Sequence, residues 1–149
     1  MIAVALVAAC GAKPRLTKSQ YERQVNHIVQ QLSTTLNTTF SSPKLQNPSS
    51  LKDAAAVLRS GQKNMERAAD ELDALNPPER IATVNDELVK GIRDFAASFG
   101  AFAQATATGD LAAIQRFSRQ VSDETLPAMS EIQKALDDLK AKGFDISKG

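Results

Sequence analysis

The chain has 149 residues, of which 42% are hydrophobic and 23% are charged, a balance typical of a globular protein with a single core. Its 18 basic and 17 acidic residues leave a net charge of +1, which argues against a nucleic-acid-binding protein, because such proteins concentrate basic residues on one face. One cysteine excludes an internal disulfide, and no apolar run reaches the roughly 18 residues of a membrane-spanning helix.

The first ten residues, MIAVALVAAC, are apolar and end at the only cysteine. The stretch LVAAC, Leu6-Val7-Ala8-Ala9-Cys10, resembles the lipobox of bacterial lipoproteins, in which an aliphatic residue and small residues precede a cysteine. The resemblance implies that signal peptidase II removes residues 1–9 and that Cys10 becomes the acylated first residue. A signal peptide has a basic start, and no Lys or Arg precedes Cys10, so we interpret residues 1–9 as a signal-peptide remnant.

Residues 10–18 are then expected to form a lipidated N-terminus and a linker. Several acyl chains together anchor a protein stably, because each buried methylene adds about 0.8 kcal/mol. The resemblance therefore places the protein in the cell envelope, anchored to the membrane and facing the extracytoplasmic side. Lys13, Arg15 and Lys18 either contact anionic lipid or are solvated linker charges.

Four helices follow, over residues 19–142. The first is predicted to start at a capping box, either Ser19 with Glu22 or Thr17 with Gln20, and to reach about residue 40. Ser50 is predicted to cap the second helix, whose small residues Ala54, Gly61 and Ala68 allow a neighbouring helix to come close. Each helix carries one apolar stripe at steps of three or four residues.

Proline and glycine mark the remaining boundaries. NPPER ends the second helix, and Pro78 suits the first position of the third. Gly109 is predicted to end the third helix and Asp110 to cap the fourth, in which Pro127 predicts a kink near residues 123–127. Gly143 terminates the fourth helix, and residues 143–149 are expected to be a tail. Since two of the three connections are very short, we expect an all-α, up-down-up-down antiparallel four-helix bundle with a kinked fourth helix.

Phenylalanine residues are expected to gather at one end of this bundle. Antiparallel helices would bring together Phe95, Phe99, Phe102, Phe117 and Phe40, with Leu51 and Leu111 at the same end. Ordinary core packing explains such a cluster, and the alternative is a pocket or exposed patch for a protein partner or a small apolar ligand. This end would point away from the membrane.

His27 is the only histidine, and it supports a different hypothesis. A helical bundle can hold haem between a histidine and a methionine, and Met65 or Met129 could supply the second ligand. His27 lies beside the apolar stripe and not at its centre, and no haem-attachment motif is present. The better interpretation is a histidine that flanks a helix interface.

The acidic residues and the remaining sequence motifs predict neither a metal site nor a catalytic site. Glu66, Asp70 and Asp73 lie on one side of a helix with Lys63 and Arg67 nearby, which indicates a solvated face and not a metal site. Asp137 and Asp138 are interpreted in the same way. Neither a nucleophile with an adjacent base nor a phosphate-binding or dinucleotide motif occurs, so we expect no enzyme and no cofactor.

The sequence therefore predicts a membrane-anchored extracytoplasmic lipoprotein that acts as a non-catalytic binding or interaction module. The phenylalanine end would carry the binding. A haem- or metal-binding bundle that uses His27 and a purely structural spacer in the envelope remain alternatives.

Overall fold

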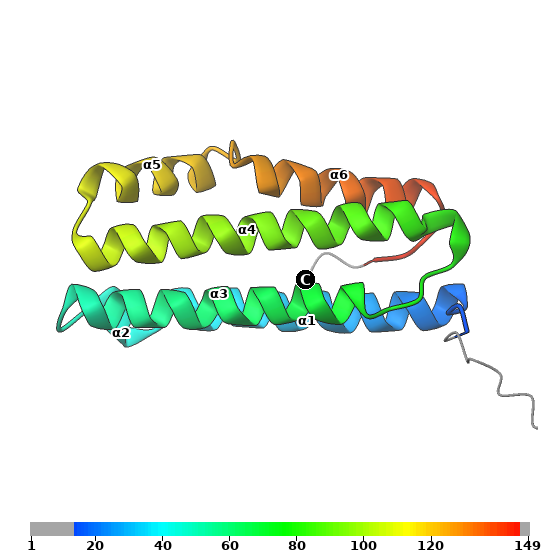
Figure 1. Ribbon diagram of the computed structural model, residues 1–149, viewed down its shortest axis with the longest axis horizontal. Coiled ribbons are helices and arrows are strands. Elements are labelled where there is room, and N and C mark those ends of the chain that lie inside the picture. Colours follow the sequence, from blue (N-terminus) through cyan, green and yellow to red (C-terminus); the bar gives the residue numbers. More distant parts are fainter. Residues whose placement is uncertain (1–13, 147–149) are drawn as a thin grey trace, which may run out of the picture.

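The computed structural model describes residues 14–146, which contain helices and no strand, so the all-α prediction is confirmed (Figure 1). The helices are α1 (Lys18–Phe40), α2 (Pro43–Gln46), α3 (Leu51–Asp73), the 3-10 turn η1 (Glu79–Ile81), α4 (Ala82–Thr108), α5 (Leu111–Ser122) and α6 (Pro127–Ala141). The lipobox-like segment with Cys10, and Lys13 of the linker, lie outside the described residues.

Side-chain caps fix the starts of three helices. The Thr17 hydroxyl accepts a hydrogen bond from the Gln20 amide N–H (3.3 Å), and the Gln20 side chain accepts one from the Thr17 N–H (2.9 Å). Of the two capping boxes that the sequence allows, the structure therefore has the one at Thr17. Ser50 caps α3 and Asp110 caps α5, as predicted, because each side chain accepts from an N–H that has no partner within its helix.

The connection between α3 and α4 differs from the prediction at one point. Pro78 is extended (ψ 139°) and precedes η1, so it is not the first residue of the long helix. At the far end of α4, Gly109 has φ 71°, a left-handed conformation that glycine adopts without a steric penalty. Gly109 thus ends α4 as the sequence predicted.

The five longer helices pack together, with α4 lying between α3 and the α5–α6 pair (Figure 1). A Cβ atom placed on Gly61 of α3 would lie 3.0 Å from the Thr39 hydroxyl of α1 and 3.1 Å from the Phe99 ring of α4. Both neighbouring helices therefore approach α3 closely at Gly61, as its position in the stripe of small residues predicted.

Where the sequence predicted one kinked helix, the structure has two, α5 and α6, separated by residues 123–126. Pro127 is at the start of α6, where its missing N–H costs no helical hydrogen bond. Glu124 has φ 54°. Among residues 14–146 it is the one residue other than glycine whose φ is positive. A left-handed residue reverses the local direction of the backbone, so the helix ends here and a new one begins.

The segment after α6 returns to the core. Gly143 has φ 79°, and the Phe144 N–H donates to the Leu139 carbonyl (3.0 Å), so the helix ends at Gly143 as predicted. Phe144, which the sequence assigns to a tail, is only 1% exposed. Its backbone continues past α1, where the Asp145 N–H donates to the Glu22 carboxylate (2.8 Å).

Two clusters of buried side chains lie along the bundle. One occupies the end where α1 begins and includes Tyr21, Ile81, Leu139 and Phe144. The other surrounds Phe99 near the opposite end. This second cluster contains the predicted binding residues.

Candidate functional site: the phenylalanine cluster

Steps of four and three residues along α4 place Phe95, Phe99 and Phe102 on one side of that helix. Their rings contact one another in sequence, with centroids 6.3 Å and 6.2 Å apart. Phe117 reaches the same cluster from α5, and its ring stacks on Phe102 at 4.5 Å with 12° between the planes. Phe40, the last residue of α1, meets Phe99 edge to face at 5.7 Å. The predicted gathering of these rings is therefore present.

The rings differ in their access to solvent. Phe99 is fully buried and Phe117 is 8% exposed, so both belong to the core that also contains Leu58 and Met65. Phe95 and Phe102 are partly buried at the edge of this core. Phe99 holds the helices together, and Phe102 has surface that a ligand can reach.

Three large apolar side chains remain exposed at this end of the molecule, namely Phe40 (45%), Leu51 (50%) and Leu111 (69%). They come from the end of α1, the start of α3 and the start of α5, which Figure 1 places together, opposite the start of α1. Leu51 lies against the turn after α4, since a Cβ on Gly109 would be 3.3 Å from its Cδ1 atom.

A groove of about 210 Å³ runs between α4 and α5 beside this cluster. Its lining is mostly apolar, and no acidic side chain takes part. The residues are Ser98, Ala101, Phe102, Ala105, Ala113, Arg116, Phe117, Gln120 and Leu126. Arg116 and Gln120 are the polar residues that α5 contributes to this lining, and the sequence analysis did not single them out. The sequence feature that could have found them is their spacing of four residues, which places both side chains on one face of α5, beside its apolar stripe.

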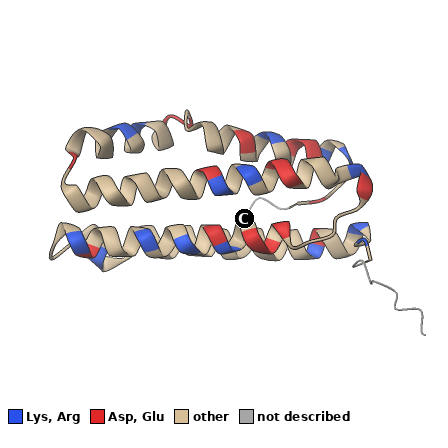
Figure 2. Ribbon diagram, viewed as in Figure 1, with Lys and Arg blue, Asp and Glu red and all other residues tan. Residues whose placement is uncertain are grey.

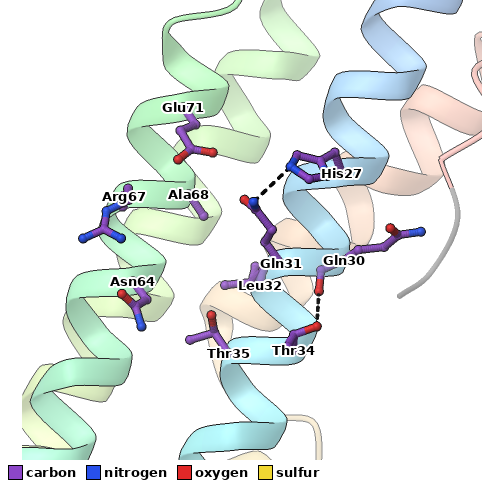
Figure 3. A pocket seen from close by; sticks show the side chains of 10 residues that line it. All are labelled: His27, Gln30, Gln31, Leu32, Thr34, Thr35, Asn64, Arg67, Ala68 and Glu71. Atoms are coloured by element: carbon purple, nitrogen blue, oxygen red, sulfur yellow. Dashed lines mark hydrogen bonds between the residues drawn. The ribbon is translucent and has the colours of Figure 1, made fainter.

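His27 is exposed on α1 and lines a different groove, of about 530 Å³, between α1 and α3 (Figure 3). Its Nε2 atom is 2.9 Å from the Gln31 side-chain amide. The other side chains that Figure 3 shows in this groove are largely polar, among them Asn64, Arg67 and Glu71 of α3.

The methionines proposed as partners of His27 lie elsewhere. Met65 is fully buried beside the phenylalanine rings, and Met129 packs partly buried against the same cluster. An exposed imidazole and a buried thioether do not face one common cavity, so the structure does not bring the haem ligands of the alternative hypothesis together. Within residues 14–146, no three His, Cys, Asp or Glu side chains are grouped as metal ligands.

Glu66, Asp70 and Asp73 of α3 are exposed, and the two aspartates pair with a basic residue. Arg93 of α4 binds Asp70 (3.0 Å) and Asp73 (2.9 Å), and Glu66 accepts a hydrogen bond from Gln62 (2.9 Å). Figure 2 shows basic and acidic residues along the length of α3, whereas the last turns of α4, at the phenylalanine end, carry none. The interpretation as a solvated face is consistent with this geometry.

The chain matches no protein-family model, no curated protein and no solved structure. None of the helices in residues 14–146 combines the length and the apolar character that crossing a membrane requires.

Proposed function

We propose that this chain is a membrane-anchored, extracytoplasmic lipoprotein that acts as a non-catalytic binding or interaction module. Its helices form an up-down-up-down bundle in which α5 and α6 together take the fourth position. The anchor is an acylated Cys10 at one end, and the binding surface is the phenylalanine end. A protein partner or a small apolar ligand binds there.

The observation that carries the proposal is the exposure of Phe40, Leu51 and Leu111 at one end of the molecule. Burying a fully exposed side chain of this kind is worth roughly 1.5–3 kcal/mol. Because these three are already partly covered, a partner that buries the rest of each gains a part of that amount. Exposed apolar residues that lie together mark interaction surfaces more often than scattered ones do.

The anchor is tested by labelled palmitate. Cells that express the chain with a functional export signal should incorporate label into it, and Cys10→Ser should abolish the incorporation. If the parent chain takes up no label while a known lipoprotein in the same cells does, the anchor is refuted.

The binding surface is tested by photo-crosslinking in the cell envelope. A photoreactive amino acid at position 111 should form discrete crosslinked species, and Leu51→Ser should remove them. Position 141, exposed at the opposite end of α6, serves as the matched control. Equal crosslinking from both positions, or none from position 111, would leave a structural spacer as the better description.

A further inference from the structure

The seam between α4 and α5 is open because α5 is loosely packed. The stripe of α5 consists of Leu111, Ile114, Phe117 and Val121, and of these only Phe117 is buried. Phe117 is therefore the buried contact of α5, Val121 packs partly buried against the same core, and the α4–α5 groove beside the Phe117 ring remains accessible.

Aromatic and aliphatic atoms form the floor of this groove. Phe102 and Phe117 stack there, and Leu126 and Ala105 close it, being 4% and 8% exposed. Such a floor favours an apolar chain, because binding on it removes the methylene groups of the chain from water.

Arg116 gives the rim of the groove a positive charge without a counterion. Among the described residues, its guanidinium has neither an ion pair nor a hydrogen bond, whereas Arg93 is held by Asp70 and Asp73. Gln120 lies one turn further along the same face of α5 and also lines the groove. A guanidinium matches a carboxylate in charge and in planar geometry.

We propose that the α4–α5 groove binds a small amphipathic carboxylate, with its apolar chain on the Phe102–Phe117 pair and its carboxylate at Arg116. This inference rests on the proposed function, because the groove belongs to the same phenylalanine cluster. The groove is smaller than the roughly 300–1,000 Å³ of pockets for drug-sized molecules, so a medium-chain acid fits it better than a large ligand.

Octanoate is the probe, with octanol and octylammonium as its neutral and cationic counterparts. They are titrated into the full-length chain carrying Cys10→Ser, so that no attached acyl chain competes, and methyl NMR signals are followed. We expect saturable shifts for Ala105, Ala113 and Leu126, and none for Ala141 at the opposite end. Octanoate should bind most tightly and octylammonium least.

Two variants and one control distinguish the contribution of the Arg116 charge from that of the apolar groove. Arg116→Gln should weaken octanoate binding about tenfold, to the level of octanol, because it removes one charge-assisted interaction. Ala101→Leu should abolish the binding of both octanoate and octanol, because the larger side chain fills the groove from an exposed position of α4. Arg119→Gln is the matched control, since Arg119 bonds to the Gln115 carbonyl of its own helix and does not line the groove.

The inference is overturned if octanoate causes no saturable shifts, if octylammonium binds equally well, or if Arg116→Gln and Ala101→Leu both bind like the parent. These outcomes do not depend on the lipid anchor or on crosslinking from position 111. Failure of the carboxylate site is therefore distinguishable from failure of the proposed function.

Discussion

Phe144 packs edge to face on Tyr21, with ring centroids 5.6 Å apart and 87° between the ring planes. The two residues are 123 positions apart, and their contact joins the end of the chain to the first turn of α1. Arg80 also lies over the Phe144 ring, with its guanidinium carbon 4.9 Å from the ring centroid. Phe144 is therefore part of the core at the end where α1 begins.

Phe144→Ala should destabilise the protein by about 3–5 kcal/mol, because it leaves a cavity beside Tyr21. Urea unfolding followed by circular dichroism measures this loss. Phe40→Ala is the matched control, and it should cost clearly less because Phe40 is 45% exposed. Equal losses for the two variants would contradict the assignment of Phe144 to the core.

In the folded protein, Tyr21 should remain protonated at pH values well above the ordinary pKa of tyrosine. Burial, and to a smaller extent the charge of Asp86, raises the pKa of the Tyr21 phenol, which donates a hydrogen bond to Asn85 (2.9 Å). The folded state therefore holds this proton more tightly than the unfolded state does. Below about pH 10 the Tyr21 proton is bound in both states and its contribution to the free energy of unfolding is fully present; this contribution declines as the pH rises further, because the unfolded state then loses the proton.

Absorbance of the phenolate checks this, since Tyr21 is the only tyrosine. At about pH 11 the native protein should lack the phenolate band, and unfolding in urea at the same pH should produce it. A native protein that titrates like a free tyrosine would show that the ring is accessible.

Tyr21→Phe should cost about 1–3 kcal/mol, because it leaves the buried Asn85 carbonyl oxygen without its donor. Combining it with Asn85→Leu should recover part of the loss, since both polar groups are then removed. Urea unfolding of the two single variants and the double variant gives the coupling between them. Additive losses would mean that the Tyr21–Asn85 hydrogen bond contributes little.

Gly91 and Gly100 should respond oppositely to alanine. A Cβ on Gly91 would lie 2.9 Å from Ile132 Cγ1 and 3.2 Å from the Ile132 backbone nitrogen, so Gly91→Ala must separate α4 from α6. This overpacking costs about 1–3 kcal/mol, more than the gain in helix propensity of about 1 kcal/mol.

At Gly100 the obstructing atoms belong to the end of the Gln62 side chain, which is partly exposed and can rotate away. Gly100→Ala should therefore raise stability by about 0.5–1 kcal/mol. Thermal unfolding of both variants tests the pair, and destabilisation at Gly100 would mean that Gln62 is held in place.

Glu124→Gly should stabilise the connection between α5 and α6. A left-handed conformation costs a non-glycine residue about 1–2 kcal/mol, and the greater freedom of glycine in the unfolded chain offsets up to about 1 kcal/mol of that gain. A rise in the thermal midpoint is expected, with Asp123→Gly as the control that should lower it. No rise for Glu124→Gly would show that position 124 is not strained.

The sequence by itself determined the positions of α1, α3 and α4 and most of the helix ends. Thr17, Ser50, Gly109 and Asp110 act on backbone groups within a few residues, so their effects are local and can be predicted without a fold. The meeting of the α4 and α5 phenylalanine residues was also predictable, because only Gly109 and Asp110 separate these two helices and their apolar stripes must meet.

Only the tertiary structure decided which side chains are buried and where the fourth helix divides. Phe144 follows a helix-ending glycine, and no local signal distinguishes a disordered end from one that packs on α1. Pro127 predicted a disturbance of the helix, but the left-handed Glu124 that turns it into two helices depends on how α5 and α6 each pack against α4. The α4–α5 groove likewise depends on how much of α5 is buried against α4. This is a contact between two helices, and the periodicity of one helix does not determine it.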